Sequence, residues 1–214
     1  MQGIVLIGMP CAGKSTLGRK IAEILNFEFF DGDAEIEKKY SDRQEFLDNY
    51  GDETYIEMEA GIIKTLPSNN SVLAPGGSVV YSKDAMQFIE RFFKVFLDVP
   101  LKTIKNRLVN NKIMDKRGIV RLNKLGIENL YAERKKLYNK YADFVINAEC
   151  EEEKSTNSIV TAYVVHQLTK KKNSISYIST NGKSKATFSE ALMQGLASDK
   201  GLFVPKYTPK LSQE

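Results

Sequence analysis

Residues 3–15 read GIVLIGMPCAGKS, and this stretch decides the fold. Its first part, GIVLI, is a short apolar run of the kind found in strands that are buried on both faces of a parallel sheet. Its second part fits the pattern G-x-x-x-x-G-K-[ST], whose glycines let successive backbone N–H groups point into one concavity. Residues 17–25 then place apolar side chains at helical spacing. This strand, loop and helix predict a phosphate-binding loop, with a chance match to the pattern as the alternative.

Each residue of the loop has an expected role. Lys14 should reach the β- and γ-phosphates of ATP, and the Ser15 hydroxyl should bind Mg²⁺. The start of the helix adds partial positive charge. Cys11 suits the loop as a small side chain, with an oxidisable thiol as the alternative. The other positions expected to contact the nucleotide are Gly8, Ala12, Gly13 and Thr16.

Beyond the loop, strands alternate with helices along the chain. Apolar runs predict four more strands, at residues 27–30, 71–74, 94–97 and 144–146. Helical segments are expected at residues 34–40, 45–50, 53–66, 82–92, 127–142 and 158–168. The alternation predicts a three-layer α/β fold with a five-stranded parallel sheet, in which ligands bind beyond the C-terminal ends of the strands. Residues 113–122 are polar, basic and contain glycine, which predicts a mobile loop.

The composition excludes several classes of protein. Hydrophobic residues make up 42% of the 214 residues and charged residues 27%, an ordinary balance for a globular chain. The net charge of +4 suits a phosphate ligand, but it is too small and too scattered to indicate nucleic-acid binding. No apolar run is long enough to span a membrane, and no secretory signal is visible. Cys11 and Cys150 lie far apart, which indicates a reducing compartment, and we expect a cytoplasmic protein.

From the loop to about Ala142, the sequence resembles the shikimate kinase family in the order and spacing of its motifs. These motifs are GKSTLGRKIAEIL, FFDGDAEIE, GDETYIEMEAGIIKTL, APGGSVV and VFLDVP, then KRG at residues 116–118 and R-x-x-x-Y-x-x-x-A-D from Arg134 to Asp143. The resemblance implies a P-loop kinase core, an acceptor-binding subdomain and a lid that closes over ATP.

The same resemblance implies roles for residues near the acceptor. Asp31 would help to hold the Mg²⁺ hydration shell, and Asp33 would bind an acceptor hydroxyl and accept its proton. The alternative for this pair is a turn with local side-chain hydrogen bonds. Gly76 and Gly77 match the acceptor-facing glycine loop, in which Ser78 stands where the family usually has a third glycine.

Three arginines also match positions of the family. Arg107 corresponds to a residue that flanks the adenine, Arg117 to the lid arginine that meets the transferring phosphate, and Arg134 to an arginine that binds the acceptor carboxylate. The alternative for Arg117 is an exposed loop charge, and the alternative for Arg134 is an ion pair with Glu133 or a neighbouring residue on the helix surface.

One departure from the family concerns the acceptor. The family has a second carboxylate-binding arginine, six residues into the segment that starts at Gly51, and Ile56 occupies that position here. A hydrocarbon cannot replace a bidentate guanidinium. Loss of one charged hydrogen bond costs about 1.5–3 kcal/mol. The departure counts against shikimate as the acceptor and leaves the phosphate loop untouched.

The C-terminal part resembles a different family. The motifs FSEAL at residues 188–192 and GLASDKGLFVP at residues 195–205 resemble the N-terminus of threonine synthases. We therefore divide the chain into a kinase domain, residues 1–170, and a linker with an incomplete threonine synthase-like segment, residues 171–214. The stretch TKKKN at residues 169–173 is either a linker or a solvated helix end. The region that bears the pyridoxal phosphate lysine of that enzyme is not included, so we expect no threonine formation.

Together these features predict a kinase that uses ATP and Mg²⁺ to phosphorylate a small hydroxylated carboxylate, with homoserine favoured and shikimate as the alternative. Threonine synthase consumes O-phosphohomoserine, so a homoserine kinase would supply it. Homoserine offers a carboxylate for Arg134, a hydroxyl for Asp33 and an ammonium for Glu57 or Glu59. The alternative from another class is a catalytically silent nucleotide-binding module. An association with threonine synthase is compatible with either interpretation.

Overall fold

The computed structural model describes residues 1–40, 43–110, 118–148, 152–174, 177–186, 191 and 194–206. The chain forms two compact units, Met1–Thr161 and Ala162–Glu214. Helix α7 (Glu152–Ser174) begins in the first unit and ends in the second.

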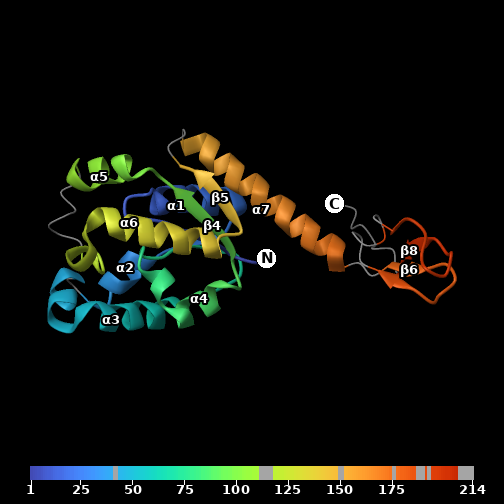
Figure 1. The fold of residues 1–214 in the computed structure, drawn as a ribbon, viewed down its shortest axis with the longest axis horizontal. Helices are drawn as coiled ribbons and strands as arrows, with labels where there is room; N and C mark the ends of the chain where they lie inside the picture. Colours follow the sequence, from blue (N-terminus) through green and yellow to red (C-terminus); the bar gives the residue numbers. More distant parts are fainter. Residues whose placement is uncertain are drawn as a thin grey trace. The chain divides into compact units, whose positions relative to one another are not determined.

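The first unit contains the predicted five-stranded sheet, and every strand of it is parallel to its neighbours (Figure 1). The strand order is β2-β3-β1-β4-β5. All four residues of the central strand β1 are fully buried, so helices must cover both faces of the sheet. The strands are β1 (Ile4–Ile7), β2 (Glu28–Asp31), β3 (Ser71–Ala74), β4 (Phe93–Asp98) and β5 (Phe144–Asn147). The predicted fold class is confirmed.

Helices follow each strand, as expected for right-handed crossovers in a parallel sheet. Helix α1 packs on β1, β2 and β3, whereas α6 packs on β4. The helices of this unit are α1 (Lys14–Leu25), α2 (Gly32–Glu37), α3 (Arg43–Ile63), the short 3-10 helix η1 (Val79–Tyr81), α4 (Lys83–Ile89), α5 (Leu101–Asn110), α6 (Leu122–Tyr141) and the first part of α7. The Ser82 side chain accepts a hydrogen bond from the backbone N–H of Ala85 and so caps α4, as its sequence position predicts.

Two glycines interrupt the long helices. Gly51 has φ 79° within α3, which therefore consists of two helical segments, in agreement with the two helices predicted around it. Gly126 has φ 71° within α6, and the helix predicted from residue 127 corresponds to the part after this bend. The turn that precedes the bend starts at Leu122, which the sequence assigns to a loop.

The carboxyl ends of β1, β2 and β3 come together at one edge of the sheet. Asp31 at the end of β2 lies opposite Ala74 at the end of β3. Gly32, the residue after Asp31, packs directly against the segment that follows β3. A Cβ at Gly32 would lie 2.8 Å from the Cα of Pro75. This close approach brings the segments after β2 and β3 beside the loop after β1.

The second unit contains a small antiparallel sheet of order β7-β6-β8, formed by β6 (Tyr177–Ser179), β7 (Lys185–Ala186) and β8 (Phe203–Pro205). The Asp199 carboxylate accepts hydrogen bonds from the backbone N–H groups of Lys183 and Gly201, each at 3.1 Å. Residues 169–173 belong to α7, so the TKKKN stretch lies at the end of a helix. No helix among the described residues is long and apolar enough to cross a bilayer.

Substituting Gly32→Ala should destabilise the first unit by about 1–3 kcal/mol, because the new methyl group collides with backbone that has little room to move. Gly61→Ala is the matched control, since Gly61 is exposed within α3 and a Cβ there meets nothing within 4 Å. The control should gain about 0.5–1 kcal/mol from reduced chain entropy. Urea unfolding of both variants measures the difference, and equal stability of the two would contradict the close packing of the strand ends.

Candidate active site

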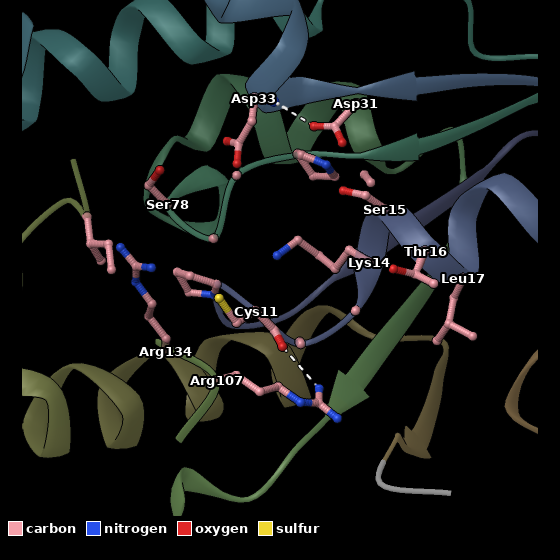
Figure 2. A pocket seen from close by; sticks show the side chains of 18 of the residues that line it. Cys11, Lys14, Ser15, Thr16, Leu17, Asp31, Asp33, Ser78, Arg107 and Arg134 are labelled. Atoms are coloured by element: carbon pink, nitrogen blue, oxygen red, sulfur yellow. Dashed lines mark hydrogen bonds between the residues drawn. The ribbon is translucent and has the colours of Figure 1, made fainter. Parts of the chain in front are cut away.

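A cavity of about 900 Å³ lies beyond the carboxyl ends of the parallel strands. It is lined by the loop after β1, the segments after β2 and β3, the start of α3, residues 118–120 and one side chain each from α5 and α6. The predicted site residues that line it are Cys11, Ala12, Gly13, Lys14, Ser15, Thr16, Asp31, Asp33, Gly76, Gly77, Arg107 and Arg134. Figure 2 shows the charged side chains of Lys14, Asp33 and Arg134 around this space.

The loop after β1 has the backbone conformation that its glycines allow. Gly8 has φ 153° and Gly13, the residue before α1, has φ 96°. Cys11 has φ 62°, which is uncommon for a residue with a side chain. The Lys14 ammonium donates to the carbonyl oxygens of Gly8 at 3.0 Å and Met9 at 2.9 Å. The carbonyl groups of Gly8 and Met9 thus fix the Lys14 ammonium beside the loop. The Lys14 side chain lines the cavity.

Burial lowers the pKa of Lys14, and the negative charge of Asp33 acts in the opposite direction. Lys14 and Asp33 line the same cavity, so their opposite charges attract each other there. The N-terminus of α1 points its unpaired N–H groups into the same space, which suits a bound phosphate.

Asp31 and Asp33 have different surroundings. Asp31 caps α2, because its Oδ1 accepts hydrogen bonds from the backbone N–H groups of Asp33 at 3.1 Å and Ala34 at 3.4 Å. The local turn that the sequence offers as an alternative is therefore present at Asp31. In Figure 2, Asp31 lies on the same side of the cavity as Ser15, and Asp33 projects farther toward Ser78 and Arg134. No three His, Cys, Asp or Glu side chains among the described residues gather in a way that holds a metal ion, so a metal here would depend on Ser15, Asp31 and bound phosphates.

Arg134 is buried rather than on the surface of α6, and only 1% of it is exposed. Its Nη2 donates to the carbonyl of Val120 at 2.9 Å, and its Nε has no hydrogen-bond partner among the described residues. Gly77 must lack a side chain here, since a Cβ would lie 2.8 Å from the Arg134 Nη1. The Tyr138 hydroxyl donates to the Gly77 carbonyl at 2.7 Å and fixes the glycine loop. A surface ion pair with Glu133 is thus excluded for Arg134.

Arg107 and Arg117 complete the predicted set. Arg107 Nη1 donates to the Cys11 carbonyl at 3.0 Å, which places the guanidinium at the outer edge of the phosphate loop (Figure 2). Arg117 and residues 113–116 of the predicted lid lie outside the described residues, as does Cys150. Gly118 packs against α3, where a Cβ would lie 3.0 Å from the Arg43 carbonyl.

The sequence model of the family "Shikimate kinase" matches residues 10–168 of the chain. The chain belongs to the shikimate kinase family. A shikimate kinase of Clostridium botulinum (strain 657 / Type Ba4) is 37% identical over 167 residues, which cover 76% of this chain and 96% of that protein. The crystal structure of shikimate kinase from Aquifex aeolicus vf5 has a TM-score of 0.62 at 29% identity, over 78% of this chain and 98% of that one. The chain is therefore a member of a family of small-molecule kinases that use ATP.

A second comparison concerns the C-terminal part. The sequence model "Threonine synthase N terminus" matches residues 176–214. A relative named threonine synthase-like 1, from Pongo abelii, is 33% identical over 227 residues, which cover 99% of this chain and 30% of that protein. The chain thus shares the order of both segments with this relative and spans about 30% of its length.

Ile56, where the resemblance to the family leads us to expect a second carboxylate-binding arginine, belongs to an apolar cluster. Only 5% of it is exposed, and it packs with Ile36, Tyr55, Ile62 and Val120. It does not line the cavity. The side chain at position 56 therefore contributes to an apolar core and offers no charged group to the cavity.

The sequence left open whether Glu57 or Glu59 faces inward, and the structure answers this. Glu57 is exposed, whereas Glu59 is 1% exposed and lies behind the glycine loop, where a Cβ on Gly76 would collide with its Oε1. Ser78, at the usual third glycine of the family, donates from its hydroxyl to the Glu59 Oε2 at 2.6 Å. Glu59 Oε1 has no hydrogen-bond partner among the described residues.

Two side chains at or beside the site were given no role from the sequence. Arg43, at the start of α3, lines the cavity, and its Nη1 lies 2.6 Å from the Asp33 Oδ1. It stands among many charged residues near the start of a helix, and no motif distinguishes it. Tyr138 is the tyrosine of the motif that starts at Arg134, and it lies four residues after Arg134 on the same face of α6, so its helical spacing from a predicted site residue is the signal that could have indicated its role.

Burial raises the pKa of Glu59 to about 7, and the Ser78 hydrogen bond opposes this shift. The folded protein then binds this proton more tightly than the unfolded chain does. The free energy of unfolding should therefore fall as pH rises from about 4.5 to about 7, by roughly 2–4 kcal/mol for this group alone.

Glu59→Gln should remove this decrease in the free energy of unfolding with rising pH, while it keeps an acceptor for the Ser78 hydroxyl. Urea unfolding at pH 5 and pH 8 measures it, with Glu57→Gln at an exposed position of the same helix as the control. The same loss of stability with pH in Glu59→Gln and the wild type would show that Glu59 is not the responsible group.

Proposed function

We propose that the chain transfers the γ-phosphate of ATP to the hydroxyl of a small carboxylate metabolite, and that L-homoserine is the favoured acceptor. The observation that carries the proposal is the arrangement of Lys14, Asp33 and Arg134 around one cavity. These three side chains provide a cation for the phosphates, a carboxylate for the hydroxyl and a cation for the acceptor carboxylate.

The proposed chemistry is mainly positioning and charge neutralisation. The loop after β1 and Lys14 hold the β- and γ-phosphates, and Mg²⁺, bound through Ser15 and Asp31, would neutralise charge on the phosphate oxygens. Asp33 orients the acceptor hydroxyl and takes its proton. We assign Arg117 to the transferring phosphate from its position in the family alone.

Three features favour a short amino acid over shikimate. Arg134 offers a buried guanidinium with an unpartnered Nε among the described residues, which suits one carboxylate. Ile56 removes the family's second carboxylate-binding arginine. Glu59 places negative charge directly behind the glycine loop, and an ammonium bound nearby would favour its ionised form.

The second segment supports the same acceptor. It matches the N-terminus of threonine synthase, an enzyme that consumes O-phosphohomoserine, and it follows a kinase in this chain and in the relative from Pongo abelii. We place the division between the two near residue 170, and we propose that the second segment associates with threonine synthase. A kinase that makes O-phosphohomoserine beside such a segment would supply the substrate of that enzyme.

The direct test compares kcat/KM for L-homoserine, shikimate and 4-hydroxybutyrate by ADP release at saturating Mg²⁺ and ATP. L-homoserine should exceed both by about tenfold or more, because each charged hydrogen bond lost to a buried group costs about 1.5–3 kcal/mol. The comparison with 4-hydroxybutyrate isolates the ammonium, since that acid keeps the hydroxyl and the carboxylate.

Lys14→Ala serves as the control, and it should abolish turnover of every acceptor. A higher kcat/KM for shikimate would reject homoserine and keep the kinase. No turnover of any acceptor by a wild-type chain that still binds ATP would favour the silent nucleotide-binding module instead.

A further inference from the structure

Arg43 is a buried cation at the start of α3 whose side chain enters the cavity. Its side chain is 7% exposed. Nη1 lies 2.6 Å from the Asp33 Oδ1, and Nη2 lies 3.3 Å from the Glu37 Oε1. Tyr55 also lines the cavity, and its hydroxyl interacts electrostatically with the guanidinium. Arg43 therefore has two carboxylates as ion-pair partners.

Its position in the helix does not explain this arginine. The first turn of a helix carries partial positive charge, which disfavours a cation there. Burial of the guanidinium adds a desolvation cost, which only paired charges and hydrogen bonds offset. The Arg43 guanidinium is therefore stabilised in its buried position by its ion-pair partners, and the closer of these two carboxylates is Asp33.

We infer that Arg43 is a positioning residue for Asp33 in phosphoryl transfer. The guanidinium fixes Oδ1 of Asp33 and leaves Oδ2 for the acceptor hydroxyl. Its planar fork reaches Asp33 with one nitrogen and Glu37 with the other, a geometry that a lysine cannot reproduce. This inference rests on the proposed function, because it requires Asp33 to act on the acceptor.

The inference also bears on Ile56. Both residues belong to α3, but Arg43 lies before the bend at Gly51 and Ile56 after it. Ile56 packs into the apolar cluster, whereas Arg43 bonds to carboxylates of the protein. Arg43 is thus engaged by Asp33 and Glu37, and the acceptor carboxylate is left to Arg134. Arg43 is a third guanidinium in the cavity, beside those of Arg107 and Arg134, but it holds the protein's own carboxylates rather than that of the substrate.

The test measures kcat and KM for L-homoserine and ATP in Arg43→Gln and Arg43→Lys. Misplacement of a reacting group costs up to about 100-fold in rate. We therefore expect a loss of that order in kcat for Arg43→Gln, with much smaller changes in the acceptor KM and in ATP affinity. Arg43→Lys should recover part of the loss, because it restores one of the two ion pairs. Lys64→Gln, which breaks an exposed ion pair with Asp84 on the surface, should leave kcat unchanged.

A double variant, Arg43→Gln with Ile56→Arg, separates positioning from binding. If Arg43 positions Asp33, the arginine at 56 should not restore kcat. Restored kcat in the double variant, or a raised acceptor KM with unchanged kcat in Arg43→Gln, would overturn the inference. If the double variant does not fold, as judged by circular dichroism, the kcat and KM values of Arg43→Gln and Arg43→Lys decide between positioning and binding.

The failure of this inference can be told from failure of the proposed function. An active wild type beside an equally active Arg43→Gln would overturn the role of Arg43 and leave the kinase standing. Absence of acceptor-dependent ADP release from the wild type would overturn both.

Discussion

The site depends on how closely the ends of three parallel strands and the helices around them approach one another. A Cβ on Gly8 would lie 3.0 Å from the Leu97 carbonyl, and one on Gly32 would lie 2.8 Å from the Cα of Pro75. A Cβ on Gly77 would lie 2.8 Å from the Arg134 guanidinium. These missing side chains bring the phosphate loop, Asp33 and Arg134 to the edge of a single cavity. Without that approach, the same residue types would lie on separate loops and could not act on one pair of substrates.

The charges in this cavity are arranged by their partners as much as by their positions. Asp33 is held by Arg43, Lys14 by two carbonyls of its own loop and Glu59 by Ser78. The Arg134 Nε and the Glu59 Oε1 lack such partners among the described residues. Buried polar atoms are normally satisfied, so the Arg134 side chain, which lines the cavity, is a place where a ligand can complete the bonding, whereas Glu59 lies behind the glycine loop. The acceptor that we propose carries both a carboxylate and a positive group, which match the charges of Arg134 and Glu59.

Much of this arrangement could be predicted from the sequence because it depends on local patterns. The motif GMPCAGKS between an apolar run and an amphipathic segment defines the loop, and the alternation of strands and helices defines the sheet. The resemblance to shikimate kinases supplied Asp33 and Arg134, which lie far from the loop along the chain. Arg43 could not be predicted, because its contact with Asp33 depends on how α3 packs beside α2, which no periodicity encodes. The small sheet of the second unit was missed because its strands are only two or three residues long.

In the proposed reaction, this cavity passes a phosphate from ATP to an acceptor hydroxyl. The most direct measurement follows ³¹P NMR spectra of the chain mixed with ATP, Mg²⁺ and L-homoserine. The account predicts that the γ-phosphate signal of ATP falls while a phosphomonoester signal of O-phosphohomoserine rises by an equal amount. Appearance of inorganic phosphate alone, or an ATP spectrum that does not change with time, would contradict it.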